Sequence, residues 1–107
     1  MSIAETELLI ATLWRAFRPL VDARVQLIES YLDQRGAPGA PASTPLEAET
    51  LAQAQAAAHN LAGALGSYGR PEGSTLAAQI ERALGQADLD TAAARSILRE
   101  LRDVVTR

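Results

Sequence analysis

The side chain in this sequence best suited to nucleophilic chemistry is its one histidine, His59. The chain contains no cysteine, and an imidazole that is largely neutral near pH 7 offers a nitrogen lone pair. His59 lies within a helical pattern from Leu46 to Tyr68, whose apolar stripe is Leu51, Ala54, Ala58, Leu61, Leu65 and Tyr68. At roughly 100° per residue, His59 points about 120° away from the centre of that stripe. We therefore expect its ring to face solvent or a partner.

The residues one and two turns from His59 on the same helix face are almost all small. They are Ala52, Gln55, Ala56, Ala62, Gly63 and Gly66. Each of the two glycines costs a helix about 1 kcal/mol relative to alanine, so their presence indicates that space beside the ring is needed. This surface is our candidate docking site for a protein that reaches His59.

The run from Ala58 to Gly69 resembles the signature of histidine-containing phosphotransfer (Hpt) domains, the relay modules of two-component systems. In that family the histidine is followed by leucine at plus two, by glycine at plus four and by a second glycine at about plus ten. The matching residues here are His59, Leu61, Gly63 and Gly69. One position departs from the pattern, because many members carry lysine three residues after the histidine and this chain has Ala62.

The resemblance implies that His59 exchanges a phosphoryl group with the phosphoaspartate of a response-regulator receiver domain, in a relay that begins at a sensor or hybrid histidine kinase. Alignment and charge neutralisation would come from the receiver's acidic pocket and its Mg²⁺. We expect no cofactor and no metal in this chain, and no kinase activity of its own, since it lacks a GxxxxGK[ST] phosphate loop. Hpt domains are commonly monomers, so the resemblance also implies a monomer, and we expect a bacterial protein. The absence of cysteine, of a membrane span and of a signal peptide favours a cytoplasmic one.

Polar support for His59 is expected from the next helix. Gln79 and Glu81 flank its apolar stripe on opposite sides, so only one of them can border His59. In the family, a residue about 22 positions after the histidine often contacts the second ring nitrogen, and Glu81 stands there. Arg82 and Arg70 are candidate phosphate contacts in place of the missing lysine.

Composition limits the other classes of function. The 107 residues fit one domain, 1–107, and 48% of them are hydrophobic. All ten basic residues are arginines, interspersed with acids to a net charge of −3, so a nucleic-acid partner is not expected. No apolar run is long enough to span a membrane. The absence of cysteine excludes disulfides and gives no reason to expect an oxidising compartment.

The helical periodicity predicts an all-α fold, an antiparallel up-and-down four-helix bundle. A first helix, about Ile3 to Asp33, is expected to be kinked or split near Pro19 and to bury Leu9, Leu13, Ala16, Phe17, Leu20, Leu27, Ile28 and Tyr31, with Trp14 also in the core. A Gly/Pro-rich loop follows at 36–45.

After the His59 helix, which Gly69 closes, two further helices are expected. One ends at Leu84 before Gly85 and buries Leu76, Ala77, Ile80, Ala83 and Leu84. The last is capped by Asp88 or Asp90 and buries Leu89, Ala93, Ile97, Leu101 and Val104.

Two alternatives to phosphotransfer stay open. The first is a four-helix interaction module that binds receiver domains without accepting phosphate, which the alanine at position 62 suggests. The second is a small enzyme or metal protein with carboxylates in the bundle core. The apolar character of the inward positions disfavours this second alternative.

Overall fold

The computed structural model describes residues 2–36 and 45–107, which form four α-helices joined by caps and turns, without a strand in those ranges. The helices are α1 (Ile3–Arg35), α2 (Pro45–Ser67), α3 (Pro71–Leu84) and α4 (Thr91–Thr106). Residues 37–44 of the predicted Gly/Pro-rich loop lie outside the described residues. None of the described helices has the length and apolarity that crossing a membrane requires.

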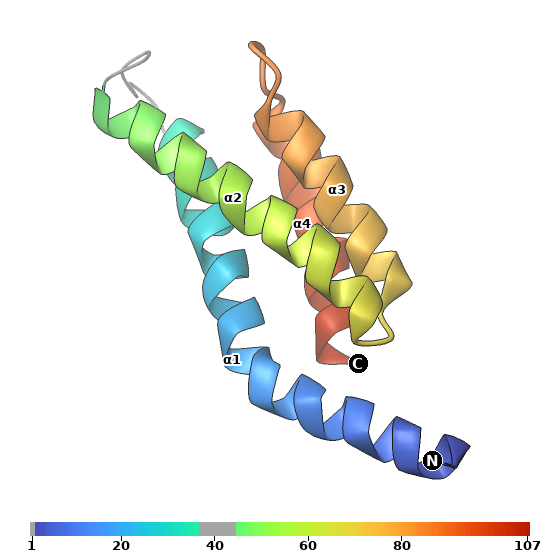
Figure 1. Cartoon of the computed structure of the whole chain (residues 1–107). Helices are drawn as coiled ribbons and strands as arrows, with labels where there is room; N and C mark the ends of the chain where they lie inside the picture. The colour runs from blue at the N-terminus through green and yellow to red at the C-terminus, as the bar shows by residue number, and fades with distance from the viewer. Residues whose placement is uncertain (1, 37–44) are drawn as a thin grey trace.

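The four helices form a bundle in which each packs against two neighbours. Contacts join α1 to α2, α2 to α3, α3 to α4, and α4 back to α1. Successive helices run in opposite directions, so both chain ends lie at the same end of the bundle (Figure 1). The core between them consists of apolar side chains, and no polar or charged residue of the described chain is buried. This architecture confirms the predicted all-α four-helix bundle.

Helix α1 is one continuous element that bends, so of the two forms expected near Pro19, a kink or a split, the structure has the kink. Pro19 lies inside the helix, where it removes one backbone hydrogen bond. The ribbon bends part-way, and its N-terminal (blue) part leaves the bundle (Figure 1). A capping box starts the helix, because Ser2 accepts from the amide of Glu5 while the Glu5 carboxylate accepts from the amide of Ser2.

The face of α1 that packs on the bundle agrees only in part with the predicted one, since Trp14, Ile28 and Tyr31 are buried as predicted. Its buried residues are Trp14, Val21, Val25, Ile28, Tyr31 and Leu32, with Phe17 half-buried. The side chains of Leu9, Leu13, Leu20 and Leu27, which were predicted to be inward, are exposed, as is Ala16. Apolar residues recur at three- and four-residue steps on two adjacent sides of this helix, and periodicity alone does not show which side meets the bundle.

The C-terminus of α2 positions the turn into α3. Gly69 adopts a φ of 76°, and the amides of Gly69 and Arg70 donate to the carbonyls of Gly66 and Leu65. This is the Schellman pattern, in which a left-handed residue, usually glycine, lets the last carbonyls of a helix find donors. The sequence-based placement of Gly69 at the end of this helix is confirmed.

Helices α3 and α4 begin and end close to their predicted bounds. Gly85 follows α3, and the Asp90 carboxylate accepts from the amide of Ala93 at the start of α4. The buried residues of α4 are Ala94, Leu98, Leu101, Val104 and Val105. Leu101 and Val104 are buried as predicted. Ala93 is exposed, so its predicted burial is wrong, because the inward residues in the first half of α4 are Ala94 and Leu98.

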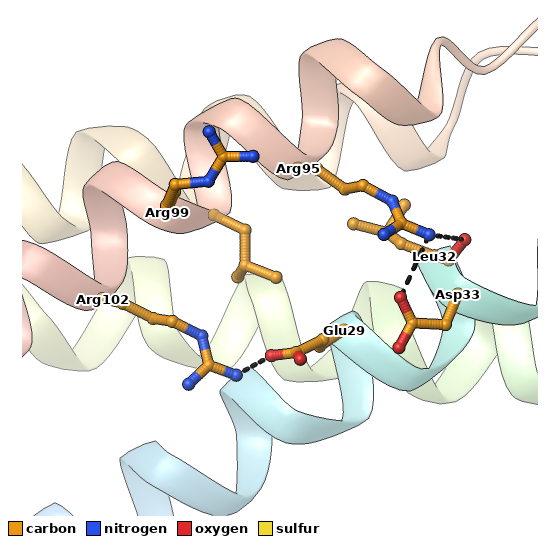
Figure 2. Close-up of a pocket in the computed structure, with 7 residues that line it drawn as sticks. Glu29, Leu32, Asp33, Arg95, Arg99 and Arg102 are labelled. Atoms are coloured by element: carbon orange, nitrogen blue, oxygen red, sulfur yellow. Dashed lines mark hydrogen bonds and ion pairs between the residues drawn. The ribbon is translucent and has the colours of Figure 1, made fainter. Parts of the chain in front are cut away.

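Charged pairs hold α4 against α1 on the side of the bundle away from α3. Arg95 lies 3.0 Å from a carboxylate oxygen of Asp33 and also donates to the Leu32 carbonyl, while Arg102 pairs with Glu29 (Figure 2). Arg99 lies between these two pairs along α4. All four paired side chains keep contact with water, so each pair contributes little to stability.

Candidate functional site

His59 occupies the outward side of α2. Ala54, Ala58, Leu61 and Leu65 are fully buried along the opposite side of that helix, and they fix its orientation in the bundle. The His59 side chain is 75% exposed, as its position relative to the apolar stripe predicted. A reacting group from another protein can therefore approach the ring without displacing any part of the core.

Glu81 of α3 holds one nitrogen of this ring. Its two carboxylate oxygens lie 2.8 and 3.2 Å from Nδ1 of His59. Burial of Ile80 and Leu84 fixes the rotation of α3, and Glu81 then lies at the edge that faces α2. A carboxylate can only accept, so Nδ1 carries the hydrogen and the neutral ring has its lone pair on Nε2. The contact thus orients the ring and selects its tautomer.

The surface around His59 consists largely of small side chains, as the sequence indicated. Ala52, Ala56, Gly63 and Gly66 are exposed, while Gln55 and Ala62 are half-buried. A Cβ at Gly63 would meet no atom within 4 Å, and one at Gly66 would meet only Ser74, at 3.8 Å. Gly63 therefore borders open space, on the side of α2 that carries His59.

Two polar contacts between α2 and α3 flank this surface, and sequence reasoning did not find them. The Ser74 hydroxyl donates to the carbonyl of Ala62, and the Gln55 amide donates to the carbonyl of Leu84 at 3.5 Å. Gln55 thus contacts the end of α3 as well as bordering the surface. Neither contact has a short-range sequence signal, since the partners are 12 and 29 residues apart.

The other predicted supporting residues do not reach His59. Gln79 is half-buried on α3 and makes no described contact with the His59 ring. Of the two residues that flank the apolar stripe of α3, Glu81 is therefore the one that borders the ring. Arg82 is exposed and makes no described contact with His59. Arg70 lies in the turn after α2, where its guanidinium is stacked over Trp14 at 3.7 Å from the ring centroid. Within residues 2–36 and 45–107, no arginine has a described contact with His59 in the place of the family's lysine.

Burial lowers the pKa of the Arg70 guanidinium, with a further contribution from the charge of Arg18. Its Nε is buried without a hydrogen-bond partner, and one terminal nitrogen donates to the Tyr68 carbonyl. Tyr68 in turn is stacked on Phe17, with the ring centroids 4.7 Å apart. These aromatic contacts fasten the α2–α3 turn to α1 and have no contact with His59.

A metal-based site receives no support from the described residues. They contain no group of three or more histidine, cysteine or acidic side chains placed to hold an ion. No carboxylate in the same residues is buried, so the bundle core offers none of the inward acids that a carboxylate-bridged metal centre requires.

Comparison with protein families finds one known domain over most of the chain. The family model of the Hpt domain matches residues 12–107. The chain belongs to the Hpt family. Comparison with curated proteins and comparison with solved structures each found no match.

Membership of the Hpt family implies a general function for the chain. Hpt domains act in histidine phosphotransfer within phosphorelays, as phosphocarriers that interact with two-component receiver domains and kinases. The match begins at residue 12, so the first turns of α1 precede the region that the Hpt model covers.

Proposed function

We propose that His59 is the phosphoacceptor of this Hpt domain and that it relays a phosphoryl group between a sensor or hybrid kinase and a response-regulator receiver domain. The observation that carries the proposal is the geometry of the ring. It is the chain's one imidazole, it is largely exposed, and a carboxylate from a neighbouring helix holds its Nδ1.

The reaction places the new bond on Nε2. The Nε2 lone pair attacks the phosphorus of a receiver phosphoaspartate, the P–N bond forms, and the acyl phosphate P–O bond breaks to return the aspartate carboxylate. The ring becomes cationic as the bond forms, and the adjacent carboxylate of Glu81 stabilises that charge. Because Glu81 contacts Nδ1, its negative charge is on the far side of the ring from the incoming phosphoryl group.

The docking surface of the proposal consists of Ala52, Gln55, Ala56, Ala62, Gly63 and Gly66. A receiver must bring its phosphoaspartate to within bonding distance of Nε2, and small side chains beside the ring permit this approach. The Mg²⁺ that neutralises the phosphoryl charge belongs to the receiver, and this chain contributes neither cofactor nor kinase activity. The cytoplasmic, bacterial setting expected from the sequence stays a prediction.

The test is phosphoryl transfer from a panel of phosphorylated receiver domains in Mg²⁺, with wild type, His59→Gln and Asn60→Gln compared. Asn60 is the matched control, because it is an exposed neighbour of His59 on the same helix. The proposal predicts label on wild type and on Asn60→Gln but none on His59→Gln. A receiver that binds wild type and His59→Gln equally and labels neither would instead support the phosphate-independent binding module.

A further inference from the structure

The outward face of α2 carries no charged side chain around His59. From Thr50 to Gly69 the sequence contains no aspartate, glutamate, lysine or arginine, whereas 21% of the whole chain is charged. Glu49, the last charged residue before this stretch, precedes His59 by ten residues, or about 15 Å along the helix. Salt at physiological concentration screens charges over about 8 Å. The uncharged surface around His59 therefore extends along α2 beyond the screening length.

This surface, here called the neutral face, consists of two lines of residues. The first line contains the histidine and small residues, and it is Ala52, Ala56, His59, Gly63 and Gly66. The second line contains uncharged polar residues at intervals of seven, close to two turns, and it is Gln53, Asn60 and Ser67. All of them are exposed, while the opposite side of α2 packs into the bundle between α1 and α3 (Figure 1). The neutral face is therefore open to a partner.

The charges beside the neutral face occur in pairs of opposite sign. On α3, Glu81 lies 2.8 Å from the His59 ring and Arg82 is the next residue, so the two charges largely offset each other at a distance. At the start of α2, Glu47 lies 3.5 Å from the guanidinium of Arg35. These pairs give the neutral face little field of either sign.

A face of this kind attracts a partner only at short range. Complementary charges speed the encounter of two proteins, and the affinity that they contribute falls as salt is added. A charged side chain of a partner that becomes buried against the neutral face would lose its hydration and find no opposite charge there, which costs affinity. The neutral face therefore fits a partner whose own contact side chains are uncharged.

We propose that the neutral face selects receiver domains whose contact surface is uncharged, and that close packing, not electrostatic attraction, sets their affinity. The inference rests on the proposed function, because it takes the surface around His59 as the place where receivers dock. Membership of the Hpt family supports a receiver as the partner. The inference adds how receivers are told apart: those with a charge at a contact position are rejected.

The salt dependence of receiver binding tests the proposal. A receiver that passes label to wild type would be titrated, unphosphorylated and in Mg²⁺, into the isotope-labelled protein, and the Kd would be measured by NMR. Between about 50 and 500 mM sodium chloride, the Kd should change by less than about threefold, because no charged pair forms at the contact. A larger increase of the Kd with salt would overturn the proposal.

Charge variants of both signs provide a second test on the same receiver. Ala56→Glu and Ala56→Lys should each weaken binding about tenfold or more, because either charge is buried without a partner. The matched controls are Ala23→Glu and Ala23→Lys, which change the net charge equally at an exposed alanine on α1, on the side away from the buried Val21 and Val25, and they should bind as wild type does. If either Ala56 variant binds as tightly as wild type or more tightly, the proposal is wrong.

The proposed function and this inference can be told apart when one of them fails. His59→Gln leaves the face uncharged, so it should bind the receiver with the same weak salt dependence while accepting no phosphate. Label on His59 together with strongly salt-dependent binding would overturn this inference alone. If no receiver passes label to wild type, the proposed function fails, and this inference fails with it.

Discussion

Replacement of Gly63 by alanine should stabilise the isolated protein. A Cβ at this position would meet no atom within 4 Å, so the substitution adds helix propensity without a clash. Glycine in a helix interior is about 1 kcal/mol less favourable than alanine. For a domain of this size, a gain of that order raises the melting temperature by roughly 4–8 °C. Thermal unfolding followed by circular dichroism measures it.

Replacement of Gly73 by alanine should have the opposite effect and destabilise the protein, so the two variants can be compared directly. A Cβ there would lie 3.0 Å from Cδ1 of Leu65 and 3.4 Å from Cγ1 of Val104, in a buried contact where α3 meets its neighbours. Overpacking of this kind costs about 1–3 kcal/mol. The gain in helix propensity, at most about 1 kcal/mol, offsets part of that cost, so the net effect should be a loss of up to about 2 kcal/mol. A Gly73→Ala variant stabilised as much as Gly63→Ala, or a destabilised Gly63→Ala variant, would refute the packing described here.

A larger side chain at position 63 tests whether receivers dock on this surface. Helical side chains lean toward the N-terminus, so Gly63→Leu would cover the surface next to His59. We expect this variant to fold and to accept phosphate from a receiver at least about tenfold more slowly, a loss near 1.4 kcal/mol. Ala93→Leu, at an exposed position on α4, is the control that should transfer normally. Equal transfer rates for both variants would show that receivers do not dock beside Gly63.

Three further outcomes follow from particular contacts. Glu81→Ala should slow transfer to His59 about 10- to 100-fold, without loss of receiver binding, because the ring loses the carboxylate that orients it; equal rates would contradict that role. Arg70→Ala should cost about 1–2 kcal/mol of stability and shift the fluorescence of Trp14, the chain's one tryptophan, to the red; an unchanged spectrum would refute the stacking. Burial raises the pKa of the Tyr31 hydroxyl, so the folded state loses stability as the pH rises above about 10; Tyr31→Phe should lessen this loss in alkaline unfolding curves.

The sequence was sufficient for the features that local rules determine. Left-handed backbone at a helix end favours glycine, which located the end of α2 at Gly69. The preference for aspartate at helix N-caps limited the cap of α4 to Asp88 or Asp90, and the structure shows that it is Asp90. The outward direction of His59 followed from the regular recurrence of small and apolar residues along α2.

Periodicity failed where a helix has more than one apolar side. In α1, the stripe containing Leu13 and Leu20 and the stripe containing Val21 and Ile28 both recur at helical spacing, and only the packing of α2 and α4 distinguishes them. The same ambiguity displaced the inward side of α4 by one residue, from Ala93 to Ala94. The choice depends on the tertiary neighbours of a helix, and the residues of the helix itself do not encode it.

In the candidate site, too, the sequence predicted some contacts and not others. Its centre, His59, and the partner 22 residues away, Glu81, were both named from the sequence, the second through the family resemblance. Arg70 was a candidate phosphate contact in place of the missing lysine, yet the structure places it over Trp14. The two residues in that contact are 56 positions apart in the chain, and residue spacing in the sequence does not predict such a contact.

Mapping the phosphorylated atom is the most direct test of the central claim. The protein would be incubated with a small phosphoramidate donor, its intact mass measured, and the modified peptide fragmented at alkaline pH, where phosphohistidine survives. The account predicts one phosphoryl group, on Nε2 of His59, that is lost in acid and absent from His59→Gln. Phosphate on any other residue, or an unmodified wild type under conditions that label another Hpt domain, would contradict it.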